Sequence, residues 1–215
     1  MGDGVTDRLQ FDRAAHRYSV NGQELPGVSR VLWPVSPWNA ENNPGVSHEV
    51  LQNKAAIGRA AHRAIELDIA GQLDASTLHP LVSPYFTAWQ RFQSEAQYLA
   101  AESELRVWHP GLGYAGTLDS LGYLHDRPAL VDFKCTVDVG PTVGPQTAAY
   151  REAAASTPEL DPELREIARD ARRWCLQLKA DGTYRLVPLD DPNDLRVFLA
   201  LLTVHNFKIR HANHY

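Results

Sequence analysis

The stretch that decides the fold is GTLDSLGYLHDRPALVDFKC, residues 116–135. Apolar residues recur at alternate positions on either side of a short polar break, which predicts two strands joined by a turn. Alternate residues of a strand share a face, so Asp132 and Lys134 are expected to point to the same side. If the two strands pair, Asp119 approaches Asp132 across the sheet. The sequence therefore predicts a polar centre on an otherwise apolar sheet.

The pattern on both sides of this stretch predicts helices around a mostly antiparallel or mixed sheet of about five strands. A strand over 104–109 is expected before the pair, and strands over 173–179 and 184–189 after it. Helices are expected over about 50–70, from 83, over 146–155, over 161–170 and from 191. The expected fold class is α/β or α+β.

We expect residues 1–10 to form a flexible tail and residues 11–215 to form one domain. Within it, residues 11–48 form an appendage that combines a hairpin with a loop. Asn21-Gly22 predicts a tight hairpin turn because both residue types tolerate a positive φ. The Trp and Pro-rich segment 33–48 is expected to be irregular.

Two helical stripes are expected to be buried. The first follows Ser83-Pro84 and comprises Tyr85, Trp89, Phe92, Ala96 and Leu99. The second belongs to the last helix and comprises Leu195, Phe198, Leu199, Leu202 and Ile209.

The composition is that of a globular chain, with 44% hydrophobic and 22% charged residues among 215. The net charge of −5 excludes attachment to nucleic acid by overall charge alone, although a local basic patch stays compatible with it. No apolar run reaches the roughly 18 residues of a membrane span, and the first residues do not resemble a signal peptide. We therefore expect a cytoplasmic protein with no membrane partner. Cys135 and Cys175 are expected to be reduced core thiols.

Several polar residues are candidates for chemistry, and each has a structural alternative. Asp132 with Lys134 is either a strand ion pair or part of a site, and Asp119 is either a strand-end residue or a ligand. Together the two carboxylates make an oxygen-rich site suited to Mg²⁺ or Mn²⁺.

One polar stripe is predicted on the helix over 50–70, where Lys54, Gly58, His62 and Glu66 recur at every fourth residue. His62 is a surface residue, a core residue with satisfied hydrogen bonds, or a ligand. Glycine inside a helix costs roughly 1 kcal/mol relative to alanine, so Gly58 is expected to permit a close approach of the backbone.

Four motifs occur in a recognisable order: Gly58-x-x-x-His62, Gly116-x-x-Asp119, Asp132-x-Lys134 and Gln146-x-x-x-Tyr150. This set resembles the RecB-like branch of the PD-(D/E)XK nuclease superfamily, and within it the small free-standing bacteriophage exonucleases. The likeness extends over about residues 11–208. It implies a restriction-endonuclease-like core and a Mg²⁺- or Mn²⁺-dependent exonuclease, with one or two ions, acting in phage DNA recombination, replication or processing. In that case the compartment would be the host cytoplasm.

The resemblance also implies roles for individual residues. Asp119, Asp132, His62 and the backbone carbonyl of Phe133 would be metal ligands, and Lys134 would act on the attacking water or the scissile phosphate. Gln146 and Tyr150 would position DNA or brace the site. Glu66 and Glu104 are alternatives for one further carboxylate, and the sequence does not decide between them.

The implied partners are single-stranded DNA or duplex ends, and a single-strand annealing or single-strand-binding protein. The alternative function is a catalytically inactive nucleic-acid-binding protein on a nuclease scaffold. Strand polarity and the choice between exonuclease and endonuclease action stay open.

Overall fold

The structure, a computed structural model, describes residues 8–37, 48–136 and 138–212. Its strands are β1 (Leu9–Asp12), β2 (Arg17–Val20), β3 (Gln23–Leu25), β4 (Tyr98–His109), β5 (Tyr114–Leu124), β6 (Arg127–Lys134), β7 (Arg172–Leu178) and β8 (Tyr184–Pro188). Its α-helices are α1 (Val28–Leu32), α2 (His48–Ile69), α3 (Ser83–Glu95), α4 (Val143–Ser156), α5 (Pro162–Asp170) and α6 (Asp194–Arg210). Short 3-10 turns, η1 (Trp33–Val35) and η3 (Ala75–Thr77), complete the order.

The main sheet has five strands in the order β4-β5-β6-β7-β8. All neighbours are antiparallel except β6 and β7, which run parallel and are joined through α4 and α5. A parallel pair needs such a crossover because a hairpin reverses the chain direction. The expected mixed sheet flanked by helices, and with it the α+β fold class, is confirmed.

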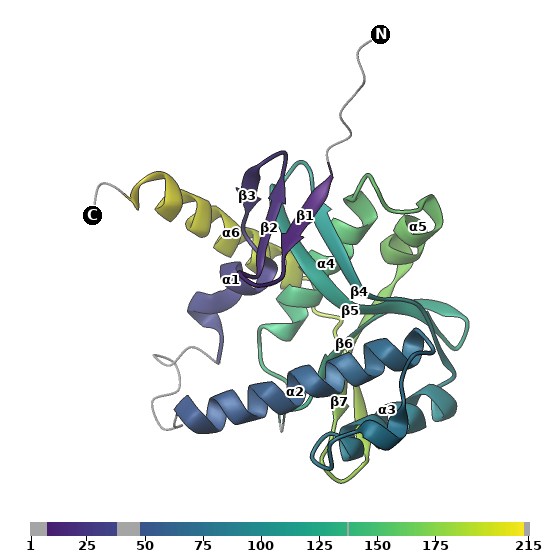
Figure 1. The fold of residues 1–215 in the computed structure, drawn as a ribbon. Helices are drawn as coiled ribbons and strands as arrows, with labels where there is room; N and C mark the ends of the chain where they lie inside the picture. Colours follow the sequence, from purple (N-terminus) through teal and green to yellow (C-terminus); the bar gives the residue numbers. More distant parts are fainter. Residues whose placement is uncertain (1–7, 38–47, 137, 213–215) are drawn as a thin grey trace.

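Helices cover both faces of this sheet (Figure 1). Helices α4, α5, α6 and α1 pack on one face, around buried residues that include Leu118, Leu130 and Phe198. Helices α2 and α3 pack on the other face, around Trp89, Phe92 and Phe133. None of the helices in the described ranges is both long and apolar enough to cross a membrane.

The N-terminal strands β1, β2 and β3 form a separate antiparallel sheet. Asn21 and Gly22 both have positive φ, 51° and 77°, as the hairpin turn requires. The sheet is tied to the main body by a hydrogen bond of 2.8 Å between the Tyr18 and Thr117 hydroxyls. Strand β1 begins at Leu9, inside the stretch expected to be a tail, whereas residues 1–7 lie outside the described residues.

The segment expected to be a loop from residue 33 is partly helical. The unpredicted helix α1 comes directly before it and buries Val28, Val31 and Leu32 in the main core. Residues 33–35 form η1, and residues 38–47 lie outside the described part of the chain.

Two residues predicted to be buried are exposed. Leu99 is 69% exposed because β4 begins at Tyr98, several residues earlier than expected, so Leu99 belongs to a strand and not to the preceding helix. Ile209 is 57% exposed because it lies in the last turn of α6, beyond the part of the helix that contacts the core. Trp89, Phe92 and Ala96 in the first stripe, and Phe198 and Leu202 in the second, are buried as predicted.

Candidate active site

Asp119 and Asp132 lie side by side on the paired strands β5 and β6. Ser120 pairs with Val131, so the antiparallel register places the next residue of each strand, Asp119 and Asp132, at the same level. The backbone N–H of Phe133 donates a hydrogen bond of 2.7 Å to the Asp119 carboxylate. The strand pattern predicted that Asp119 and Asp132 lie at neighbouring positions of the sheet, and the register of the two strands confirms it.

Helix α2 brings His62 onto these strands. Its Nδ1 lies 3.5 Å from an Asp119 carboxylate oxygen, and its Nε2 lies 3.0 Å from the Phe133 carbonyl oxygen. If Nε2 carries the proton and donates it to this carbonyl, the Nδ1 lone pair faces the carboxylate side of the site. Ala61, Ala64 and Ile65 of this helix are buried in the core and hold the helix at this position.

Glu104 adds a second carboxylate to this group from β4. The pairs Ser103–Ser120 and Leu105–Leu118 flank it, so Glu104 lies opposite Asp119. One ligand atom each from His62, Glu104 and Asp119 lie within 4.8 Å of one another. Glu104 has a φ of +50°, a conformation that costs a residue other than glycine about 1–3 kcal/mol. Such strain inside a strand is typical of functional positions.

The charges of these groups act on one another. Burial raises the pKa of Glu104, and the neighbouring Asp119 adds to this, bringing it to about 7. Burial would also raise the pKa of Asp119, but His62 and Lys134 outweigh that effect and lower it. Burial would lower the pKa of His62, and the Asp119 carboxylate outweighs burial and raises it. A cation among these groups would relieve the repulsion between the carboxylates.

Asp132 is paired with Lys134. Their side chains point the same way, as predicted, with 2.5 Å between Nζ and the carboxylate, and the Asp132 side chain is only 1% exposed. Burial raises the pKa of Asp132 to about 6 in spite of the Lys134 charge. Within the described residues, Asp132 is not one of the three groups that meet within 4.8 Å, so its role as a ligand stays a prediction.

Gln146 and Tyr150 border the same centre from α4. The Gln146 side-chain amide donates a hydrogen bond of 3.1 Å to the Tyr150 hydroxyl. Tyr150 is buried and packs where a side chain at Gly116 would stand, because a Cβ there would clash with the Tyr150 ring. Gly116 is therefore required for the contact of α4 with β5. This packing favours a bracing role for Tyr150.

The expected reason for Gly58 is wrong. A Cβ on Gly58 would meet no atom within 4 Å, so the backbone approaches nothing closely there. Gly58 lines the open cleft in front of His62. The missing side chain keeps this part of the cleft open.

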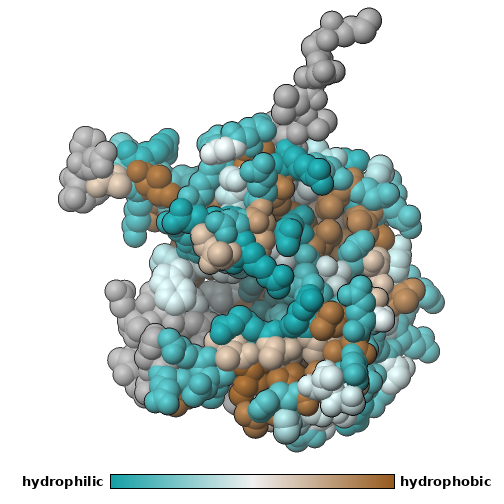
Figure 2. Space-filling view, in the orientation of Figure 1, coloured by the Kyte–Doolittle hydropathy of each residue, from teal (hydrophilic) through white to brown (hydrophobic). Residues whose placement is uncertain are grey.

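His62, Glu104, Asp119, Gln146 and Tyr150 line a cleft of about 640 Å³ between the N-terminal hairpin and α2, with Asp132 and Lys134 behind this lining. In Figure 2 it is the hollow below the hairpin, with mostly hydrophilic residues on its rim. Six arginines line it, against four acidic residues, so its lining is positive although the chain carries a net charge of −5. The arginines are Arg13, Arg17, Arg30, Arg59, Arg63 and Arg106.

Sequence reasoning missed the arginine lining and could not choose between Glu66 and Glu104. Two of the arginines come from the hairpin, one from α1, two from α2 and one from β4, and only the packing of these elements brings them together. Glu66 lines the cleft, but the group that meets His62 and Asp119 contains Glu104. In the sequence, Arg59 and Arg63 flank His62 on one helix, and this spacing could have indicated that the side of the cleft formed by α2 is positively charged.

No protein-family model matches the chain, and no curated protein is detectably similar to it. Among solved structures, the chain is similar to an alkaline exonuclease, LHK-Exo, from Laribacter hongkongensis. The two are 16% identical, with 88% of this chain and 94% of that chain covered and a TM-score of 0.33. A second structure, LHK-Exo in complex with dAMP, also shares 16% identity, covers 89% of this chain and 95% of that chain, and has a TM-score of 0.32.

Proposed function

We propose that this protein is a nuclease that uses divalent metal ions to hydrolyse DNA phosphodiester bonds and that it acts as an exonuclease. The observation that carries the proposal is the meeting of His62, Glu104 and Asp119 beside the Asp132–Lys134 pair, at the floor of an arginine-lined cleft. The four-motif resemblance to RecB-like nucleases supports the same function.

The residues of the site fit a divalent cation. Both oxygens of the buried Asp132 carboxylate have no hydrogen-bond partner other than the Lys134 ion pair among the described residues. Carboxylate oxygens suit Mg²⁺ and Mn²⁺, and an imidazole suits Mn²⁺ better than Mg²⁺. His62, Glu104 and Asp119 would hold the cation, with Asp132 and the Phe133 carbonyl as further candidates. When bound, a cation there supplies positive charge to the phosphate and makes bound water more acidic.

The other residues serve binding and orientation. Lys134 places a positive charge where the attacked phosphate gathers negative charge, and Asp132 holds the lysine in position. The Phe133 carbonyl orients the His62 ring through Nε2. Tyr150, packed on Gly116, braces α4 behind the floor.

The arginines supply the affinity for DNA. Exposed guanidinium groups on two facing walls can bind the phosphates on both sides of the one held at the floor. The net negative charge of the chain does not argue against DNA binding, because the local electrostatic field of the cleft, which is positive, acts on the bound DNA. A phage origin, a cytoplasmic location and an annealing or single-strand-binding partner stay predictions.

The test is degradation of 5′- and 3′-labelled DNA in single-stranded, duplex and circular form, with Mg²⁺, Mn²⁺ or EDTA. We expect metal-dependent hydrolysis that EDTA stops, with linear DNA degraded and circular DNA spared. Asp119→Asn should lower kcat by about 10²–10⁴-fold, because several kcal/mol of transition-state stabilisation are lost. Asp190→Asn is the matched control, since Asp190 is exposed and does not line the cleft.

The alternative function, a catalytically inactive nucleic-acid-binding protein, is tested by the same assay. The presence of His62, Asp119, Asp132 and Lys134 argues against it, because an inactive relative has no need to keep all four. DNA binding without hydrolysis in either metal would favour it over the nuclease.

A further inference from the structure

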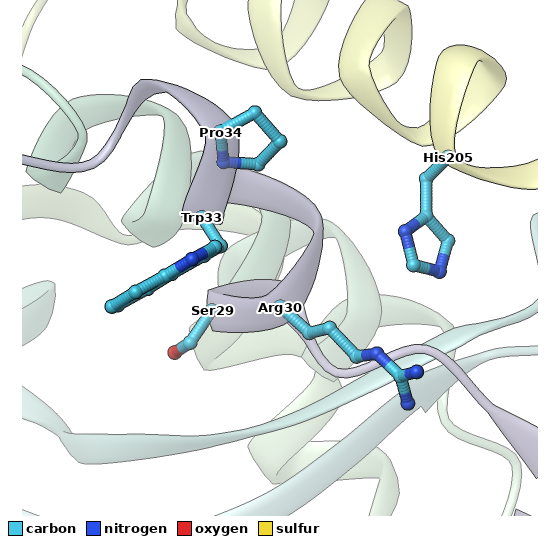
Figure 3. Close-up of a pocket in the computed structure, with 5 residues that line it drawn as sticks. All are labelled: Ser29, Arg30, Trp33, Pro34 and His205. Carbon is cyan, nitrogen blue, oxygen red and sulfur yellow. The ribbon is translucent and has the colours of Figure 1, made fainter. Parts of the chain in front are cut away.

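A second hollow lies next to the active-site cleft. It lies between α1 with its following turn η1 and the last helix, α6 (Figure 3). Ser29 and Arg30 line both this hollow and the active-site cleft, so the two are neighbours on the surface. Trp33, Pro34 and His205 complete the lining of the second hollow.

The short helix α1 determines which side chains face this hollow. Val28, Val31 and Leu32 are buried in the core, so the helical repeat turns Ser29, Arg30 and Trp33 to the outside. Gly27 pairs with Ala115 of β5, which fixes the start of α1 to the floor of the cleft. The outward side chains are therefore held at a set position relative to the active site.

Trp33 is unusual among the tryptophans that the structure describes. Its side chain is 49% exposed, whereas Trp89 is fully buried and Trp108 is 5% exposed. Within the described residues no ring contact or hydrogen bond involves the Trp33 indole. An exposed indole offers a flat face to a second aromatic ring.

Two nitrogen-bearing side chains, Arg30 and His205, line the same hollow as Trp33. Arg30 is exposed and also donates a hydrogen bond of 3.1 Å to Glu24. Burial lowers the pKa of His205, and the charges of Arg30 and Lys208 lower it further. Figure 3 shows His205 extending from α6 toward the side of α1 that carries Arg30. Aromatic faces combined with cations are the features by which proteins bind single-stranded nucleic acid.

We propose that Trp33 forms a base-stacking subsite for a single strand of DNA that passes from the active site over Arg30. The occupant is an unpaired nucleobase, whose flat ring matches the indole, while Arg30 binds the adjoining phosphate. This inference rests on the proposed nuclease function, because it extends the path of that substrate. It names single-stranded DNA as the form bound outside the catalytic centre.

The test measures equilibrium binding of a 12-nucleotide oligothymidylate in EDTA, so that hydrolysis does not interfere. A set of oligonucleotides carries one abasic position moved along the chain. In the wild-type protein we expect one position to weaken binding by about 5- to 150-fold, the range for stacking of one base. Trp33→Ala and Trp33→Leu should weaken binding of the intact oligonucleotide to the same extent and abolish the sensitivity to that position.

Two variants serve as controls. Trp33→Phe should keep most of the affinity and the position dependence, because it retains an aromatic face; this separates stacking from a general packing effect. Leu81→Ala removes another exposed apolar side chain, 58% exposed and outside both hollows, and should behave like the wild type.

The inference is overturned if Trp33→Ala binds as tightly as the wild type, or if Trp33→Leu matches Trp33→Phe. A wild-type protein that shows the position dependence but does not degrade DNA in Mg²⁺ or Mn²⁺ overturns the nuclease function and leaves the stacking subsite supported. A wild-type protein that binds none of these oligonucleotides overturns both.

Discussion

The two walls of the cleft are built in different ways. Helix α2 is anchored in a large core cluster through Ala61, Ala64 and Ile65, and it delivers His62 to within hydrogen-bonding distance of β6. The hairpin β1–β3 packs on the main sheet through a small apolar cluster shared with Trp108 and Ala115. It lines the cleft with Arg13, Arg17 and Glu24 among other side chains. From this difference we predict that the α2 wall contributes to catalysis and that the hairpin wall contributes to the binding of DNA.

Between the two walls, the Asp132–Lys134 pair is where we expect the largest effect of a substitution on catalysis. Lys134→Ala should lower kcat by about 10²–10³-fold, because a positive charge is lost where the phosphate becomes more negative. Calorimetric titration with Mn²⁺ should still show binding, since an ammonium repels a cation and its loss frees Asp132. Lys179→Ala, at an exposed turn, is the control. Loss of metal affinity together with activity would indicate that the Asp132–Lys134 pair is only structural.

His62→Ala tests the α2 wall. We expect kcat in Mn²⁺ to fall by about 10–100-fold and kcat in Mg²⁺ to fall less, because imidazole nitrogen prefers the softer ion. The binding of DNA in EDTA should stay close to that of the wild type. Equal losses in the two metals, or a loss confined to KM, would remove His62 from the chemistry and break the contrast between the walls.

Replacement of both Arg13 and Arg17 by alanine tests the hairpin wall. We expect KM for DNA to rise while kcat changes little, and the salt dependence of binding to weaken. For single-stranded DNA the slope of log K against log salt should shrink by up to about 1.4, or about 0.7 for each phosphate that an arginine no longer binds. Arg127→Ala with Arg196→Ala, exposed and outside the cleft, is the matched pair. A fall in kcat with unchanged salt dependence would assign chemistry to the hairpin as well.

Glu104→Gln tests the electrostatics of the floor through stability. In the fold the pKa of Glu104 is raised from 4.5 to about 7, so the folded protein loses stability as the pH rises through 7 and the carboxylate ionises. In EDTA the variant should therefore melt at a higher temperature than the wild type at pH 8. We expect a difference of roughly 2–8 °C, which corresponds to about 1–2 kcal/mol in the free energy of unfolding. This energy is smaller than the pKa shift alone would give, because water reaches part of the Glu104 side chain and screens its charge. At pH 5 the two should melt nearly together.

A melting difference between Glu104→Gln and the wild type that is the same at pH 5 and pH 8 would contradict the proximity of Glu104 to Asp119. Glu102→Gln, on the same strand but exposed, controls for the substitution itself. Scanning calorimetry of the metal-free proteins is the appropriate measurement.

Much of the local structure was predictable from the sequence. The Asn21-Gly22 turn, the strand pair around Asp119 and Asp132, and the common face of Asp132 and Lys134 depend on residues close together in the chain. Turn chemistry and a repeat of two residues express such local preferences directly. The position of Leu99 was not predictable in the same way, because the helical stripe and the first residues of β4 share one apolar pattern.

Only the tertiary structure decided what surrounds these elements. The register of β4 against β5 brings Glu104, and not Glu66, into the group with His62 and Asp119. The packing also gathers arginines from the hairpin, α1, α2 and β4 around one cleft. The tertiary structure also showed that Gly58 opens the cleft and that Trp33 faces out beside it. Local sequence specifies the period and the face of each element, whereas the meeting of distant elements depends on how their apolar faces pack together, and no short segment encodes that.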